Sequence, residues 1–243
     1  MKKIIVIPAR LSSSRLPNKV LLDLKGKTIL QRVYEQCMKV NGVVVFIATD
    51  SLKVKKSCLE YTQNVIMTSV EHKSGTDRIA EAIKGLDFEA VINVQGDEPL
   101  FNPIDIKKLI TQVQQTNNKY EVFSGYCSIQ NNEQFFSLDV PKVVFNHEEE
   151  LLYMSRSGIP GNKRGDFVGG FRQVCAYAFS KKSLMKFCKF NRKTSLEEIE
   201  DIEILRFIEI GIKIKMIEMS QDSISVDREE DLLKVLKRLK NVK

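Results

Sequence analysis

One polar loop carries three cations at positions suited to phosphate binding. It runs from Pro8 to Lys19 and places Arg10, Arg15 and Lys19 around a run of serines. Arginine presents a planar fork of N–H groups to phosphate oxygens and lysine a point charge, while small serine side chains let backbone N–H groups approach a ligand. The loop therefore predicts a phosphate site. The alternative is a solvated basic loop without a ligand, because charged runs commonly face water.

Two aspartates each follow a predicted strand. Asp97 comes after the apolar run 90–94 and beside Gly96, and Asp227 follows the shorter run 223–226. Mg²⁺ typically takes one or two protein carboxylates and leaves its other positions to water and substrate phosphates. If the two strands share an edge of one sheet, Asp97 and Asp227 form one magnesium site. Either aspartate could instead cap a turn or a helix, and Asp227 is a suitable N-cap.

A third candidate segment is the run from Ser74 to Arg78, where small residues lead into an amphipathic helical pattern. The unpaired N–H groups and the positive dipole end of a helix N-terminus favour an anionic or acceptor-rich ligand. Ser74 or Thr76 could bond to such a ligand. Capping of the helix alone is the other interpretation, and both stay open.

Several other chemistries lack their motifs. Gly26-Lys27-Thr28 matches the end of a phosphate loop, but position 21 is leucine where that motif needs glycine, so we predict a turn before a helix capped by Thr28. His72 and His147 have no Cys or carboxylate spacing for zinc. No G-x-S-x-G elbow is present, which argues against a covalent hydrolase.

Four strand-then-helix units are expected to position these segments. The strands are expected at 3–8, 43–48, 65–67 and 90–94, and the helices from about residues 28, 52, 76 and 104. Short apolar runs are typical of strands that are buried on both faces of a parallel sheet. The alternation predicts an α/β fold with a doubly wound, mostly parallel sheet, in which ligands bind where the strands end.

The pattern changes in the middle of the chain. The segment 120–170 contains strand-like pieces between polar and Gly-rich loops, which predicts an inserted antiparallel sub-region. Helical spacing at 196–210, strands at 213–217 and 224–226, and a last amphipathic helix follow. Because no linker or repeat separates these parts, residues 1–243 are expected to form a single domain.

Composition narrows the class of protein. The chain has 243 residues, 43% of them apolar and 28% charged, and a net charge of +7 that suits an anionic ligand but is too diffuse to indicate nucleic acid. The longest apolar runs are far below the roughly 20 residues of a membrane span. Five cysteines form no C-x-x-C pair, which argues against a disulfide framework. We expect a cytoplasmic protein without a targeting segment.

Three segments together resemble the CMP-Kdo synthetase family, the 3-deoxy-manno-octulosonate cytidylyltransferases. They are P-A-R-L-S-S-S-R-L-P-N-K-V-L at 8–21, S-G-T-D-R at 74–78 and N-V-Q-G-D-E-P at 93–99, and S-R-S-G-I-P at 155–160 extends the resemblance. It implies a Rossmann-like nucleotidyltransferase fold. It also implies transfer of CMP from CTP to the anomeric hydroxyl of 3-deoxy-manno-octulosonate, with release of pyrophosphate.

The resemblance further implies roles for individual residues. The CTP phosphates would be held by Arg10, Arg15 and Lys19. The nucleotide would be surrounded by Ser74, Thr76, Arg78 and Gln95. Mg²⁺ would be bound by Asp97 and Asp227, and catalysis would depend on Arg15, Lys19 and Asp97. The sugar acid would be bound by Arg156, Gln173, Tyr177, Glu200 and Glu203. The family also suggests a homodimer, with the irregular region 120–170 as a contact surface.

Two departures from the family pattern concern the sugar. Gln173 stands where the family usually has histidine, and Ile204 replaces the glutamine of E-Q-L-R. A lost hydrogen-bond partner for a sugar hydroxyl changes selectivity strongly. A related 3-deoxy-2-ulosonic acid is therefore an alternative substrate. A nucleotide-binding module without turnover is a separate alternative.

Overall fold

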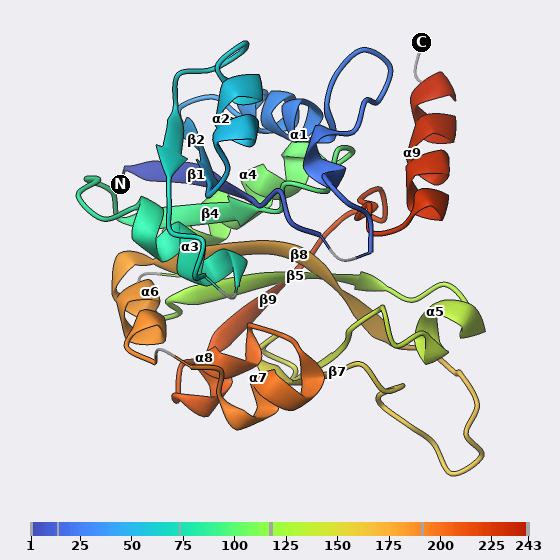
Figure 1. The fold of residues 1–243 in the computed structure, drawn as a ribbon. Helices are drawn as coiled ribbons and strands as arrows, with labels where there is room; N and C mark the ends of the chain where they lie inside the picture. Colours follow the sequence, from blue (N-terminus) through green and yellow to red (C-terminus); the bar gives the residue numbers. More distant parts are fainter. Residues whose placement is uncertain (1, 14, 73, 117–118, 191, 242–243) are drawn as a thin grey trace. The chain divides into compact units, whose positions relative to one another are not determined.

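The computed structural model describes residues 2–13, 15–72, 74–116, 119–190 and 192–241 (Figure 1). Ser14 of the predicted phosphate loop lies outside these residues. The chain forms two compact units: a terminal unit of residues 1–107 and 222–243, and an inserted unit of residues 108–221. The inserted unit is longer than the expected sub-region at 120–170. That the whole chain acts as one domain stays a prediction.

A parallel sheet forms the centre of the terminal unit. Its strands are β1 (Lys3–Ala9), β2 (Val44–Thr49), β3 (Val65–Met67) and β4 (Ala90–Val94). β1 pairs in parallel with both β2 and β4, and β2 pairs in parallel with β3. Every residue of β1 and β4 is buried, as continuous apolar strands require when both faces are covered. The four predicted strands and their parallel arrangement are confirmed.

Helices of the terminal unit begin where the sequence carries capping residues. α1 (Ile29–Met38), α2 (Leu52–Cys58) and α3 (Gly75–Ala82) follow Thr28, Ser51 and Ser74, and each of these side chains accepts a hydrogen bond from a first-turn N–H group. The residues before Thr28 form a turn in which Gly26 has φ +78°. The structural interpretation of Gly26-Lys27-Thr28 is therefore confirmed.

The last helix belongs to the same unit as the first strand. α9 (Glu229–Asn241) buries Val235 in a cluster that also contains Leu16, Leu24 and Val226. Leu16 precedes the short 3₁₀ helix η1 (Lys19–Leu21) of the predicted phosphate loop. Apolar packing thus brings the C-terminal segment to the loop that follows β1.

The inserted unit contains both antiparallel and parallel strand pairs, and the antiparallel pairs agree with the prediction (Figure 1). Its elements are β5 (Val122–Ser128), α5 (Asn132–Phe136), β6 (Lys142–Phe145), β7 (Leu151–Ser155), β8 (Phe171–Ser180), α6 (Lys181–Cys188), α7 (Ser195–Glu200), α8 (Leu205–Glu209) and β9 (Ile214–Glu218). β5 is antiparallel to β8 and parallel to β9, while β6 is antiparallel to β7 and β8. α4 (Pro103–Gln115) contains the boundary between the two units.

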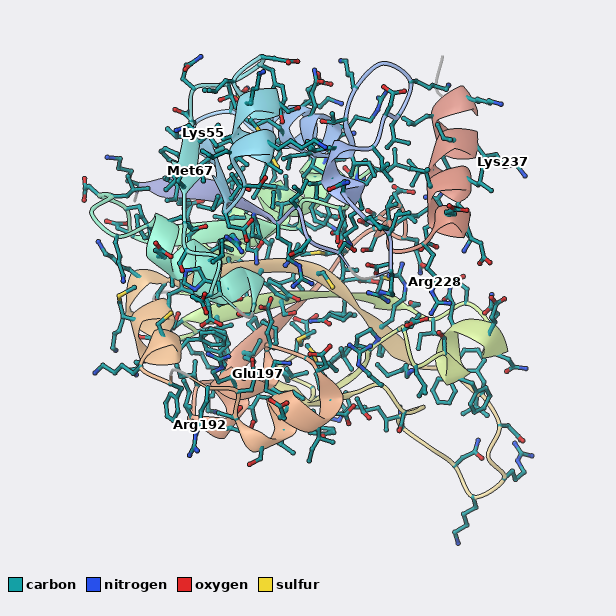
Figure 2. All side chains as sticks on the ribbon, viewed as in Figure 1. Lys55, Met67, Arg192, Glu197, Arg228 and Lys237 are labelled. Carbon is teal, nitrogen blue, oxygen red and sulfur yellow. The ribbon has the colours of Figure 1, made fainter. Side chains whose placement is uncertain are left out.

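The single helix predicted at 196–210 is wrong. The chain forms α7 and α8 instead, and Asp201 between them adopts the left-handed conformation at φ 51°. Helical spacing persists across the break because both helices bury side chains in the same unit, including Glu197 of α7 (Figure 2) and Arg206 of α8. Periodicity alone does not report a local break of this kind.

The strand predicted at 224–226 is also wrong. These residues make no ladder, although the Val226 N–H donates to the Asp97 carbonyl at 2.9 Å. Apolar character reflects burial here: Val226 is fully buried against α9 and its neighbours. The sequence analysis also did not identify β8 or α6.

Two further expectations concern location and redox state. Within the described parts of the chain, no helix combines the length and apolar character needed to cross a membrane. None of the five cysteines forms a disulfide, and Cys37, Cys58 and Cys127 are buried.

Candidate functional site

The two predicted magnesium ligands meet at one lysine. Lys19 Nζ lies 2.5 Å from Asp97 Oδ2 and 2.8 Å from Asp227 Oδ1. Arg15 adds a second cation, with Nη2 at 3.0 Å from the same Asp227 oxygen. Two cations and two carboxylates from distant parts of the sequence therefore form one cluster in the terminal unit.

Asp97 is positioned by a close approach of two loops. It follows β4, and a β-carbon on the neighbouring Gly96 would lie 2.8 Å from the Pro8 carbonyl oxygen at the end of β1. Real β-carbons do not come this close to backbone oxygens, so glycine is required. The loops after β1 and β4 consequently lie against each other, and Asp97 reaches the loop that carries Lys19.

Asp227 does not cap the last helix. The carboxylate of Asp231 accepts hydrogen bonds from the N–H groups of Asp227 and Arg228 at 3.3 and 3.1 Å, and Arg228 marks the residue before α9 (Figure 2). Asp231 therefore satisfies the N–H group of Arg228 at the start of the helix. The Asp227 side chain is left to face Lys19 and Arg15, which favours the functional interpretation over capping.

The cluster shifts the pKa of its members in opposite directions. Burial lowers the pKa of the Lys19 ammonium, but the facing carboxylates of Asp97 and Asp227 outweigh it and hold that pKa above its usual value. Burial raises the pKa of Asp227, but Lys19 and Arg15 outweigh it and hold that pKa below its usual value. Lys19 and Asp227 are therefore both charged at neutral pH.

The N-terminus of α3 lies beside Gln95. A β-carbon on Gly75 would be 3.5 Å from Gln95 Oε1 and 3.4 Å from the Pro8 ring, so the helix start, the end of β1 and the residue after β4 are neighbours. Ser74 Oγ accepts from the Asp77 N–H at 3.1 Å and donates to the Asp77 carboxylate at 2.7 Å. Ser74 thus acts as a cap, and Thr76 is fully buried.

Arg78 is placed differently from the predicted nucleotide contact. Its guanidinium donates to Asp50 Oδ2 and Thr68 Oγ1, both at 2.6 Å, and to the Ser69 carbonyl at 3.3 Å. The Arg78 side chain is only 4% exposed. It therefore ties α3 to the residues after β2 and β3. Arg10, by contrast, is exposed after β1.

The acidic pair fits the predicted magnesium. The described residues contain no group of three or more His, Cys, Asp or Glu side chains that could hold a metal ion. Asp97 and Asp227 supply two carboxylates that already face a cation, the Lys19 ammonium. Two protein carboxylates are a sufficient set for Mg²⁺ when phosphate oxygens complete its coordination.

The predicted sugar-binding residues all lie in the inserted unit. The Arg156 guanidinium already has hydrogen-bond partners within that unit. It donates to three backbone carbonyls, those of Glu200, Leu138 and Asp201, at 2.6, 2.8 and 3.0 Å. The Glu200 carboxylate in turn accepts from the Arg156 N–H at 2.8 Å and from Ser155 Oγ at 2.7 Å. Arg156, which is predicted to bind a sugar carboxylate, therefore connects the end of β7 to the end of α7 through hydrogen bonds.

Gln173 and Tyr177 form a second pair. Gln173 Nε2 donates to the Tyr177 hydroxyl at 3.0 Å, and both residues are buried. Residues four apart in a regular strand are separated by about 13 Å. The β5–β8 register shifts between Ser124 and Gly125, so β8 is not a regular strand between Gln173 and Tyr177 and their side chains can meet. Glu203 is half-buried between α7 and α8.

Two buried charged residues, one in each unit, were not predicted from the sequence. Glu98 stands next to Asp97, and Lys142 donates to the carbonyls of Ser137 and Arg156. The available signal was a charge beside an apolar run, Glu98 after β4 and Lys142 before Val143-Val144. Charged side chains are rarely buried without partners, so such positions carry structural information.

Comparison with known proteins identifies the chain's relatives. Residues 4–214 match the family described as Cytidylyltransferase. A 3-deoxy-manno-octulosonate cytidylyltransferase of Flavobacterium johnsoniae is 37% identical over 245 residues, which cover 100% of both chains. An 8-amino-3,8-dideoxy-manno-octulosonate cytidylyltransferase of a Shewanella species is 37% identical over 243 residues, which cover 98% of this chain and 99% of the relative.

A solved structure agrees with these relatives. The CMP:2-keto-3-deoxy-manno-octonic acid synthetase complexed with CTP has a TM-score of 0.91 and 34% identity to this chain, covering 99% of both. The parallel strands, the cation cluster after β1 and the full-length matches converge on one conclusion. The chain belongs to the cytidylyltransferase family, and it is a nucleotidyltransferase enzyme.

Proposed function

We propose that this enzyme transfers CMP from CTP to the anomeric hydroxyl of 3-deoxy-manno-octulosonate. In this reaction the anomeric oxygen forms a bond to the α-phosphorus, the hydroxyl proton leaves to solvent, and the bond to the bridging oxygen breaks to release pyrophosphate. The observation that carries the proposal is the Lys19–Asp97–Asp227 cluster with Arg15 beside it. Relatives named for this activity cover the full chain.

In the proposed mechanism the protein positions two anions and neutralises their charge. Phosphoryl transfer needs little covalent participation from the protein, so positioning and electrostatic stabilisation dominate. Lys19 and Arg15 hold the phosphate oxygens and stabilise the negative charge that develops as pyrophosphate leaves. Gln95, which follows β4 and lies beside the N-terminus of α3, contacts the nucleotide in this proposal.

Asp97 and Asp227 hold Mg²⁺ in this proposal. When held by these residues, the ion would supply positive charge that offsets the charge of the phosphates. Both carboxylates already balance the ammonium of Lys19, so they present negative charge toward a common point.

A second sugar has specific support. Relatives named for 8-amino-3,8-dideoxy-manno-octulosonate are as similar to this chain as those named for 3-deoxy-manno-octulosonate. Gln173 and Ile204 are the departures from the family pattern in the inserted unit, and both are buried. The amide of Gln173 donates to Tyr177 and thereby orients the Tyr177 hydroxyl.

The deciding experiment is pyrophosphate release with CTP and a panel of ulosonic acids. Turnover with 3-deoxy-manno-octulosonate at the highest kcat/KM supports the proposal, and preference for the 8-amino sugar selects the second candidate. CTP binding without pyrophosphate release with any sugar acid would contradict both. UTP in place of CTP is the control for the nucleotide.

We also propose a cytoplasmic homodimer. Free cysteines are typical of a reducing compartment. Exposed apolar side chains in the inserted unit offer a contact surface, among them Phe136, Leu138, Leu152 and Val168. Sedimentation of the purified chain tests the dimer.

A further inference from the structure

Two contacts connect the segment before α9 to the loop after β4. The Val226 N–H donates to the Asp97 carbonyl at 2.9 Å. Three residues earlier, the Ser223 hydroxyl makes a close hydrogen bond to the Glu98 carboxylate. Glu98 is 3% exposed and Ser223 is 9% exposed. Both contacts lie within the terminal unit.

These contacts matter because the segment lacks a strand ladder. Residues 219–228 form neither helix nor strand, so regular backbone pairing does not set their register against β4. Glu98 adjoins Asp97, and Ser223 lies four residues before Asp227. A shift of the segment by one residue would carry the Asp227 carboxylate away from Lys19, and it would also move Val226 out of the cluster that it shares with Val235.

A buried carboxylate is a strong anchor for such a register. Burying a carboxylate costs free energy unless hydrogen bonds satisfy its oxygens. Sliding the segment would separate Ser223 from Glu98 and place an apolar side chain, such as that of Ile224, beside the carboxylate. The Glu98–Ser223 bond therefore penalises the alternative alignments of the two chain segments.

We propose that Glu98 and Ser223 are positioning residues that set the spacing between the Asp97 and Asp227 carboxylates. Neither residue belongs to the Lys19 cluster, and both act through the aspartates. The inference rests on the proposed function in that Asp97 and Asp227 are its metal ligands. Partners that orient metal ligands typically change metal affinity or activity by about 10- to 100-fold when they are removed.

The test compares three variants in the full chain. Ser223→Ala removes the hydroxyl, and Ser223→Thr retains it as the conservative rescue. Tyr34→Phe is the matched control, because the Tyr34 hydroxyl also makes a hydrogen bond within the terminal unit, to Thr62 Oγ1 at 3.1 Å, away from the cluster. Thermal melting of all three shows how much each change affects folding.

The first readout is Mn²⁺ binding in the presence of CTP, followed by electron paramagnetic resonance. We expect Ser223→Ala to weaken Mn²⁺ binding about tenfold, and Ser223→Thr and Tyr34→Phe to bind as the wild type does. The second readout is steady-state kinetics, in which Ser223→Ala should lower kcat about tenfold with little change in KM for the sugar acid.

Other results would overturn either the positioning role of Ser223 and Glu98 or the proposed function. If Ser223→Ala shifts only the melting temperature, as Tyr34→Phe does, and leaves Mn²⁺ affinity and kcat unchanged, the bond is merely structural and the proposal is overturned. If the wild type binds no Mn²⁺ with CTP, the proposal also fails, since no metal site exists to be positioned. If Mn²⁺ binding follows the expected order but no ulosonic acid yields pyrophosphate, only the proposed function fails.

Discussion

Two charge clusters, one in each unit, differ in how far solvent reaches them. In the inserted unit, Arg206 and Glu197 form a bidentate pair with distances of 2.6 and 2.7 Å, and their side chains are 2% and 1% exposed. The Arg206 guanidinium also lies 3.7 Å from the centre of the Phe187 ring. This pair is sealed from solvent and joins α7 to α8.

The Lys19 cluster of the terminal unit is more accessible than this pair. Lys19, Asp97 and Asp227 have side chains that are 11%, 21% and 31% exposed, and Asp227 is shared between two cations. Ligand oxygens or a metal ion can therefore exchange with the internal partners. Both clusters have similarly short distances, so exposure and shared partners are what distinguish the proposed binding site from the sealed ion pair.

The largest effect is expected from Asp97→Asn. The change keeps the shape of the side chain but removes a negative charge from the proposed metal site. We expect kcat to fall on the order of 1,000-fold, or about 4 kcal/mol of barrier. Pyrophosphate release measures it. Near-normal turnover with an intact fold would remove Asp97 from the mechanism and make the cluster a scaffold like that of the inserted unit.

Arg206→Met should act on stability with a comparable free energy. It leaves Glu197 buried without its partner, which typically costs about 3–5 kcal/mol. Urea unfolding measures the loss, and kcat of the folded fraction at low temperature should change little. As a control, the double variant Glu197→Leu with Arg206→Met should recover most of the stability, since it removes both charges. A double variant as unstable as the single one would contradict the sealed-pair interpretation.

Lys19→Met should separate catalysis from metal binding. Loss of the ammonium is expected to lower kcat about 100-fold, because one stabilising cation at the phosphates is gone. In the absence of CTP it should strengthen Mn²⁺ binding about tenfold, since the ammonium no longer competes for Asp97 and Asp227. Weaker Mn²⁺ binding without CTP would show instead that Lys19 holds the two carboxylates in place.

The smallest effect concerns pH. The pKa of Asp227 is held below its ordinary value of 3.8, so the unfolded chain binds more protons than the folded one in that range. The contribution of Asp227 to stability is therefore complete above about pH 4 and is lost as pH falls through its lowered pKa. Urea unfolding of Asp227→Asn should show a shallower loss of stability below pH 4 than the wild type. Equal slopes would show that Asp227 is not coupled to Lys19.

The terminal unit was the more predictable part of the fold. Its strands are short apolar runs, of which β1 and β4 are buried throughout. Three of its helices begin directly after the capping residues Thr28, Ser51 and Ser74. Both signals are local. In the inserted unit, the break at Asp201 depends on one left-handed residue between two helices that bury a common side, so periodicity predicted a single helix.

The candidate site was also only partly predictable from the sequence. Side-chain chemistry was sufficient to select Lys19, Asp97 and Asp227 as candidates. Arg78 and Arg156 look equally suited to an anion in the sequence, yet the fold assigns their guanidinium groups to internal partners. Sequence reasoning cannot see this difference, because the acceptors are backbone carbonyls and side chains far along the chain.

Residue types and their local order thus determined where strands begin, which helices are capped and which side chains can bind phosphate or magnesium. Only the tertiary structure decided which of those side chains stay available. Burial of Leu16, Val226 and Val235 in one cluster brings the C-terminal segment to the loop after β1, and Asp227 comes with it. The physical reason is that hydrophobic burial joins segments without regard to their separation in sequence, whereas charge chemistry can act only on the neighbours that such burial provides.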